Sequence, residues 1–138
     1  MAKKKLKVGI QAGAGRAPGY NWTVLYLAVA REEASRFLGP AQYAHVVDQI
    51  KSLAREEDPT HPQTVSVDAI EDFFELREKG GPLGRTNVRV FFVLDKEAQA
   101  IVVLGAIKKE ADGATPAGDR IRMRYRRRKY LAGEFEED

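Results

Sequence analysis

The stretch NVRVFFVLDKEAQAIVVLGAIKK, residues 87–109, decides the fold of this chain. Two runs rich in branched and aromatic residues, 87–95 and 100–107, flank the polar tetrapeptide KEAQ at 96–99. Such side chains favour an extended backbone, and a short polar break between two such runs predicts an antiparallel hairpin. The glycine-rich GGPLG at 80–84 marks the turn that leads into this hairpin.

The segment before the hairpin predicts one strand and two helices. WTVLYLAVA at 22–30 is a β-type run, and REEASRFL at 31–38 predicts a short helix that Gly39-Pro40 ends. From 41 to 57 the apolar residues recur at intervals of three and four, which is typical of an amphipathic helix with one buried stripe. Pro40 suits the first turn of that helix.

Two further segments complete the expected order of elements. VSVDAIEDFFELREKGG at 65–81 leaves two interpretations open, a helical turn over VDAIEDFFEL or a strand over DFFELRE. Thr115 followed by Pro116 predicts a helix start with threonine as the N-cap, and this helix runs to Gly133. The order predicts an α+β fold, a small antiparallel sheet with an N-terminal helix pair and a C-terminal helix.

The composition excludes several classes of function. The chain has 138 residues, about the length of one domain. It has no cysteine, which excludes disulfides, thiolate zinc sites and cysteine nucleophiles. Its two histidines, His45 and His61, make a multi-histidine metal site unexpected. No apolar run approaches ~18 residues and no signal peptide is recognisable, so we expect a cytoplasmic protein without metal, cofactor or membrane contact.

The charge is uneven along the chain. The formal net charge is only +3, but residues 85–130 carry twelve basic and five acidic side chains. Four lysines lie within residues 1–7, and the last eight residues contribute four acids. A basic surface of this kind attracts phosphate groups, so the last third of the chain is a candidate for nucleic-acid contact. A solvated basic helix without a partner is the structural alternative.

The chain is expected to divide into three parts, a flexible basic extension at 1–21, a folded domain at 22–132 and an acidic tail at 133–138. Within the extension, LKVGIQA at 6–12 could form a short strand, and GAGRAPG at 13–19 loosely suggests a phosphate-binding loop. Neither G-x-x-x-x-G-K-[ST] nor G-x-G-x-x-G is present, so this nucleotide-binding alternative is the weakest. A site there would require a strand before the loop and a helix after it.

A set of charged and aromatic residues recurs in order through the second half of the chain. Its members are Glu75, Leu76, Arg77, Arg89, Lys108, Lys109, Thr115, Pro116, Arg126 and Tyr130. An arginine stands before an aromatic-rich strand, the next strand ends in two lysines, and Thr-Pro opens a helix with a later arginine and tyrosine. This ordered set resembles the RelE/ParE toxin superfamily, most closely its HigB-like, phage-derived group. The likeness covers about residues 22–132 and implies a RelE-like fold.

The resemblance also implies an activity and partners. Toxins of the HigB-like group are similar to small ribosome-dependent endoribonucleases that cut mRNA in the ribosomal A site. The implied reaction is metal-independent attack of a ribose 2′-OH on the adjacent phosphate, which leaves a cyclic phosphate and a free 5′-OH. The implied partners are mRNA, the ribosome and a cognate antitoxin, often a small helix-turn-helix protein, in a type II toxin–antitoxin system.

The matched motif, residues 75–130, contains no histidine, so arginine and lysine must supply the charge that stabilises the transition state. The resemblance assigns Arg89 and Arg126 to the phosphate. Lys108 or Lys109 would act as the base where clustered positive charge lowers its pKa from ~10.4. Tyr130 is a candidate acid, base or stacking ring. Further substrate contacts are expected from Arg77, Arg127 and Arg128.

The same residues also allow structural roles. Arg89 could pair with Glu75, the lysines could protect a strand edge, and Tyr130 could pack on the sheet. The chain also departs from the family pattern at Ile107, Asp119, Arg120 and Met123. These departures leave a second function open, a non-enzymatic member of the fold. Such a member could inhibit DNA gyrase as ParE-like proteins do, or could be a degenerate toxin that only binds nucleic acid or antitoxin.

Overall fold

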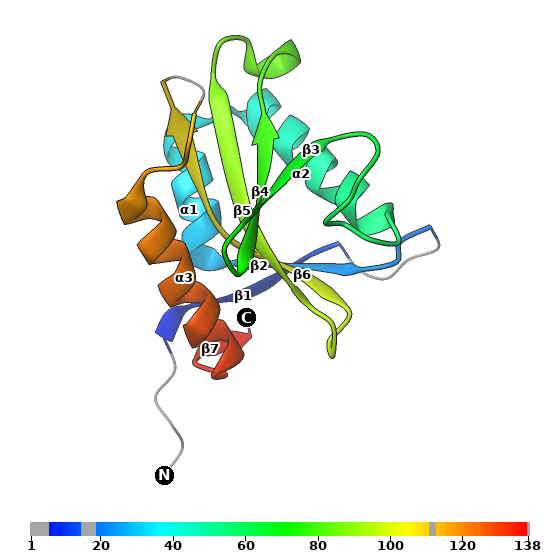
Figure 1. Cartoon of the computed structure of the whole chain (residues 1–138), viewed down its shortest axis with the longest axis vertical. Helices are drawn as coiled ribbons and strands as arrows, with labels where there is room; N and C mark the ends of the chain where they lie inside the picture. The colour runs from blue at the N-terminus through cyan, green and yellow to red at the C-terminus, as the bar shows by residue number, and fades with distance from the viewer. Residues whose placement is uncertain (1–5, 15–18, 111–112, 138) are drawn as a thin grey trace.

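The computed structural model describes residues 6–14, 19–110 and 113–137 (Figure 1). Its strands form one seven-stranded mixed sheet in the order β3-β4-β5-β6-β2-β1-β7. The elements in chain order are β1 (Leu6–Ala14), β2 (Thr23–Leu27), α1 (Ala28–Phe37), α2 (Pro40–Arg55), β3 (Ser66–Ile70), β4 (Phe73–Glu78), the 3₁₀ turn η1 (Gly81–Leu83), β5 (Asn87–Asp95), β6 (Ala100–Lys109), α3 (Ala117–Leu131) and β7 (Phe135–Glu137). The predicted α+β class is confirmed, with its N-terminal helix pair and its C-terminal helix.

β5 and β6 form the hairpin that the sequence predicts. β5 and β6 pair antiparallel, from Asn87 opposite Lys109 to Asp95 opposite Ala100. Of the two interpretations of residues 65–81, the strand is confirmed, because β3 and β4 form a second antiparallel hairpin. Glu71 makes its turn with a φ of +54°, a conformation that few residues other than glycine adopt.

The N-terminal segment differs from the expected flexible extension. Over Leu6–Ala14 the chain forms β1, which pairs antiparallel with β2 and parallel with β7. The physical reason is that β2 would otherwise present an unpaired edge, whose backbone groups gain hydrogen bonds from an added strand. Part of the expected acidic tail becomes β7 in the same way. Residues 1–5, 15–18 and 138 lie outside the described part of the chain.

The helices begin and end close to the predicted residues. α1 starts at Ala28, three residues before the expected 31, because the β-type run continues into an alanine-rich helical turn. α2 confirms the amphipathic helix, and Gln42 Oε1 accepts a hydrogen bond from the Gly39 N–H at its start (3.1 Å). The Thr115 N-cap is wrong, since Pro116 occupies that position and the Thr115 hydroxyl is bonded elsewhere. Within the described part of the chain, no helix has the length and apolar character to cross a membrane.

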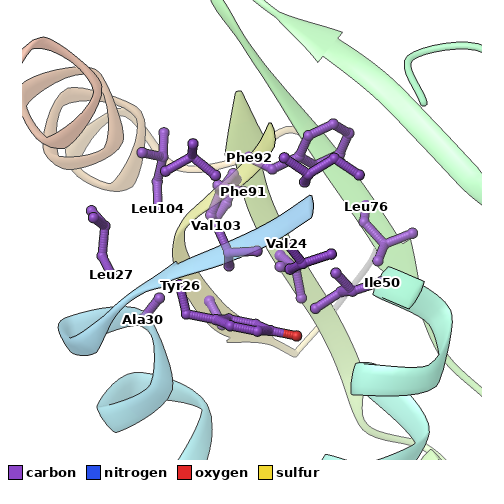
Figure 2. Close-up of a cluster of buried hydrophobic side chains, with 14 of the residues drawn as sticks. Val24, Tyr26, Leu27, Ala30, Ile50, Leu76, Phe91, Phe92, Val103 and Leu104 are labelled. Carbon is purple, nitrogen blue, oxygen red and sulfur yellow. The ribbon is translucent and has the colours of Figure 1, made fainter. Parts of the chain in front are cut away.

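The helices cover opposite faces of the sheet, α1–α2 on one and α3 on the other, and buried hydrophobic side chains lie on both faces (Figure 2). Leu76 of β4 and Ile50 of α2 are both buried in the part of the core between the sheet and α1–α2. The neighbouring Glu75 contacts Thr115, immediately before α3. Because successive side chains of a strand point to opposite faces, α2 and the start of α3 lie on opposite sides of β4.

An ion pair closes the part of the β6 edge that β2 does not cover. β2 pairs with β6 only from Ala100 to Val103. Beyond that point Arg126 Nη1 donates to the Leu104 carbonyl oxygen (2.9 Å), and the Ala106 N–H donates to Glu33 Oε1 (3.2 Å). Arg126 also donates from both terminal nitrogens to the Glu33 carboxylate, at 2.7 and 2.9 Å. The pair therefore binds β6 backbone groups as a neighbouring strand would, and it joins α1 to α3.

Gly105 allows this approach, because a Cβ at that position would overlap the pair. Such an atom would lie 2.6 Å from Arg126 Nη1 and 2.7 Å from Glu33 Oε1, and it would also clash with Met123 Cε. Real Cβ atoms essentially never come so close. α3 can therefore pack on β6 only while residue 105 has no side chain.

Gly105→Ala is expected to lower the free energy of unfolding by about 1–3 kcal/mol, because it overfills a packed contact. Gly118→Ala is the matched control: Gly118 lies in the first turn of α3 with open space around its Cα. That change should be neutral or stabilise by about 0.5–1 kcal/mol, since glycine disfavours helix. Urea denaturation followed by circular dichroism measures both, and equal stabilities would contradict the packing described.

Candidate functional site

The structure does not gather the eight predicted site residues in one place. Four of them, Arg77, Arg89, Lys108 and Lys109, lie at the end of the sheet where β4 and β6 finish and β5 begins. We call this end, defined by Arg77, Lys79, Asn87, Lys108 and Lys109, the lysine end. The other predicted residues are Arg126, Arg127, Arg128 and Tyr130, which all lie on α3.

The last turns of α3 lie toward the opposite end of β5. The Tyr130 hydroxyl donates to Asp95 Oδ2 (2.7 Å), and Asp95 is the last residue of β5. Eight residue steps of about 3.3 Å, roughly 26 Å, separate Asp95 from Asn87 at the lysine end. Tyr130 therefore cannot act on the same phosphate as Lys108 or Lys109 in this conformation.

Arg89 is buried inside the lysine end. Its side chain and that of Glu75 have no exposed surface, and Arg89 Nη1 lies 3.4 Å from Glu75 Oε1. Arg89 Nη1 also donates to Thr115 Oγ1 (3.2 Å), and the Thr115 hydroxyl donates to Glu75 Oε2. The guanidinium thus neutralises a buried carboxylate and secures the residue before α3. A phosphate cannot reach it without displacing Thr115.

Arg77 is the accessible arginine of this end. Its Nε donates to the buried Glu75 Oε1 (2.6 Å) and lies 2.9 Å from Asp68 Oδ2, while about a third of its side chain is exposed. Arg77 stands directly opposite Arg89 across the β4–β5 pair, so both side chains project from the same face. The Glu75 carboxylate therefore binds both the buried Arg89 guanidinium and the partly exposed Arg77 guanidinium.

Lys108 and Lys109 are the last two residues of β6. Lys108 is exposed and Lys109 half-buried, and neither forms a hydrogen bond or ion pair with any described residue. Their side chains point to opposite faces of the sheet, as neighbours in a strand do. Lys109 is opposite Asn87 and shares the face of Arg77, whereas Lys108 is opposite Val88 on the face covered by α2.

A polar groove of about 870 Å³ opens beside Arg77. It is lined by Gln49, Gln63, Thr64, Val65, Ser66, Arg77, Glu78, Lys79 and Asn87. Gln49 Nε2 donates to Glu78 Oε1 (2.6 Å), which ties α2 to the end of β4. The volume lies within the range of small-ligand sites, and amides, hydroxyls and cations are the groups that bind a base, a ribose and a phosphate. Asn87 both lines this groove and pairs with Lys109, so the two features are continuous.

The sequence did not indicate the groove residues, because they come from four separate segments that only the fold brings together. No local spacing connects Gln49 of α2 with Gln63 of the following loop or with Asn87 of β5. The one available signal was FFELREK, where Arg77, Glu78 and Lys79 follow one another at the end of a strand.

The basic residues of α3 are mostly bound to acidic partners. Arg126 is buried against Glu33, as described above, and Arg127 Nη1 lies 3.3 Å from Asp72 Oδ2. Arg128 is exposed and has no ion pair with any residue that the structure describes. Of the predicted phosphate ligands, therefore, Arg89 and Arg126 serve the interior, and Arg77, Lys108 and Lys109 offer accessible charge at the sheet end.

The nucleotide-binding alternative at GAGRAPG lacks its expected context. β1 ends at Ala14 inside this stretch, and the next described element is the strand β2 rather than a helix. A helix N-terminus pointing at the loop is what makes such glycine-rich turns bind phosphate. Residues 15–18 lie outside the described part of the chain.

Glu75→Gln is expected to lower the free energy of unfolding by about 3–5 kcal/mol, because it leaves the charge of buried Arg89 without a counter-ion. Asp68→Asn is the matched control, since Asp68 binds the same Arg77 but is half-exposed. It should change stability by less than about 1 kcal/mol.

Chemical denaturation measures both changes. A third variant, Glu75→Leu with Arg89→Met, removes both buried charges and should recover most of the lost stability. A Glu75→Gln protein as stable as the wild type would show that the buried pair does not carry the charge balance described.

No protein-family model matches the chain, and no curated protein matches it either. The assignment of a function therefore depends on the chemistry of the lysine end and on the resemblance carried by residues 75–130.

Proposed function

We propose that the chain is the toxin of a type II toxin–antitoxin system and cleaves mRNA on the ribosome at its lysine end. The observation that carries the proposal is the continuity of the polar groove with an accessible arginine and with two lysines that have no partner among the described residues. Cations bind the sugar-phosphate backbone, while amides and hydroxyls read an unstacked base. A single strand of RNA presents both kinds of group in succession.

We assign a role to each residue of the lysine end according to the face of the sheet from which its side chain projects. Arg77 and Lys109 share one face and are assigned to the phosphate at which cleavage occurs. Lys108 projects from the other face and is assigned to a flanking phosphate. Arg89 acts from within, because it holds Glu75 and so positions Arg77.

The proposed reaction needs no metal. The 2′-oxygen attacks phosphorus as the bond from phosphorus to the 5′-oxygen breaks, which yields a 2′,3′-cyclic phosphate and a 5′-OH. Lys109 in its neutral form accepts the 2′-OH proton, and the leaving oxygen takes a proton from a neighbouring ammonium or from water. The Arg77 guanidinium stabilises the negative charge that develops on the phosphate oxygens.

One observation favours the second candidate, a non-enzymatic binder of nucleic acid or antitoxin. Tyr130, the expected acid or base, binds Asp95 far from the lysines. A lysine end without a tyrosine or histidine proton donor could bind RNA without cutting it. Inhibition of DNA gyrase remains the other form of this candidate.

Lys109→Ala is expected to lower mRNA cleavage at least ~100-fold, since loss of a general base removes this much rate. Lys108→Ala is the matched control, because it removes the same type of side chain from the opposite face, and it should lower cleavage less than ~10-fold. The measurement is induced expression in a bacterial host, with growth recorded and cut sites mapped by primer extension on abundant transcripts. Circular dichroism confirms that both variants fold.

The same experiment separates the candidates. In-frame cuts that disappear with Lys109→Ala support the nuclease. Growth arrest with intact mRNA and broken chromosomal DNA would identify a gyrase inhibitor. A folded protein that binds single-stranded RNA with a steep salt dependence but causes neither arrest nor cuts would be the non-enzymatic binder. Cleavage unaffected by Lys109→Ala would overturn the assignment of the site.

A further inference from the structure

The outer face of α3 carries the exposed large hydrophobic side chains of the described structure. Ile121, Tyr125 and Leu131 are 61%, 46% and 53% exposed, and all three belong to this one helix. The helix lies on the outside of the molecule, in front of the sheet (Figure 1). Contiguous exposed apolar side chains on a small domain mark an interaction surface more often than isolated ones do.

These side chains form one stripe because of their spacing. At ~100° per residue, Ile121 and Tyr125 lie about 40° apart around the helix and Leu131 about 80° to the other side of Ile121. Met123 and Arg126, which are buried, occupy the opposite side of α3. The stripe therefore faces away from the sheet from Ile121 to Leu131, without the first turn of the helix.

The charge around the stripe is positive, although most basic side chains of α3 have acidic partners. α3 contains six arginines, one lysine and a single acid, Asp119. Arg124 and Arg128, which lie within the stripe, are both exposed. Arg124 Nε lies 3.1 Å from Glu71 Oε2, and Arg128 has no counter-ion among the described residues. An occupant of this face must bring apolar side chains and negative charge together.

This charge selects among the occupants that such a face could have. A second copy of the chain would place one arginine-rich helix against another, and like charges at an interface disfavour association by several kcal/mol. A nucleic-acid phosphate would satisfy Arg128 but would leave Ile121 and Leu131 in water. An amphipathic helix with an apolar stripe and flanking glutamates or aspartates satisfies both requirements.

We propose that the outer face of α3, defined by Ile121, Arg124, Tyr125, Arg128 and Leu131, binds an acidic amphipathic helix of another protein. The apolar stripe of that helix covers Ile121, Tyr125 and Leu131, and its carboxylates pair with Arg128 and Arg124. If the proposed function holds, the antitoxin is the protein that carries this helix. The surface is separate from the lysine end, so such a partner could bind without covering Lys109.

The probe is a synthetic 21-residue stapled, monomeric helix with leucines on one stripe and glutamates flanking it. The matched control peptide has the same leucines with lysines in place of the glutamates. Fluorescence anisotropy with the full chain should show at least ~10-fold tighter binding of the glutamate peptide, a difference of about 1.4 kcal/mol. Ile121→Ser with Tyr125→Ser should weaken binding of the glutamate peptide at least ~10-fold. Arg128→Glu should reduce the ratio between the affinities for the glutamate peptide and the lysine peptide.

Lys109→Ala is the control that keeps the two proposals distinguishable. It should abolish RNA cleavage and leave peptide binding unchanged, because Lys109 lies at the lysine end. The serine substitutions are at exposed positions, and thermal unfolding checks that the variants fold.

Three results would overturn the proposal. Equal binding of the two peptides would show that charge does not select the occupant. Peptide binding that is unchanged by the two serine substitutions would show that the peptide-binding site lies elsewhere on the molecule. A dimer in sedimentation experiments that Ile121→Ser dissociates would show that a second copy of the chain occupies this face. Displacement of the peptide by a single-stranded RNA 12-mer would show that nucleic acid occupies it.

Discussion

The arrangement of the helices depends on how the open edge of β6 is closed. β2 is too short to cover that edge, and Glu33 and Arg126 bind its free backbone groups instead. A buried ion pair adds little net stability, because desolvation offsets the attraction between the charges. Its hydrogen bonds are directional, however, and they determine where α1 and α3 meet the sheet. Gly105 makes the close approach possible. The inner face of α3 is thereby defined, and so is the face that stays in water.

A second buried network, at the lysine end, determines which charges remain available for chemistry. Glu75 is shared by Arg89 inside and Arg77 outside, and Thr115 is bound to the same carboxylate. The buried Arg89 guanidinium fixes the Glu75 carboxylate, and this carboxylate in turn holds the Arg77 guanidinium at the surface. The accessible cations of this end are few, and Arg77 is held in place by Glu75 and Asp68, which suits recognition of a single phosphate better than the diffuse attraction of a basic helix. Most arginines of α3 are meanwhile neutralised by acidic neighbours, so the high charge of that segment overstates its affinity for nucleic acid.

The two surfaces proposed here have different physical characters. The lysine end is polar and hollowed, with hydrogen-bonding groups and with ammonium groups that have no partner among the described residues. The outer face of α3 is convex and apolar, with arginines among its hydrophobic side chains. Their separation allows a protein partner and an RNA to be bound at different places. Regulation by such a partner would then act through α3, which begins next to Thr115 and so adjoins the network that holds Arg77.

The sequence by itself determined the elements whose signals are local: the β5–β6 hairpin, the amphipathic α2 and the extent of α3. Periodicity and turn residues act over a few positions, so they can be recognised without the fold. Only the tertiary structure decided the roles of the arginines, because their partners are distant along the chain. Arg126 meets Glu33 across 93 residues. The strand β1 was expected only as a possible short strand at 6–12, since its pairing with β2 and β7 is a property of the assembled sheet. Whether a charged side chain is available to a ligand depends on its neighbours in space, and these neighbours are set by the tertiary fold and not by the local sequence.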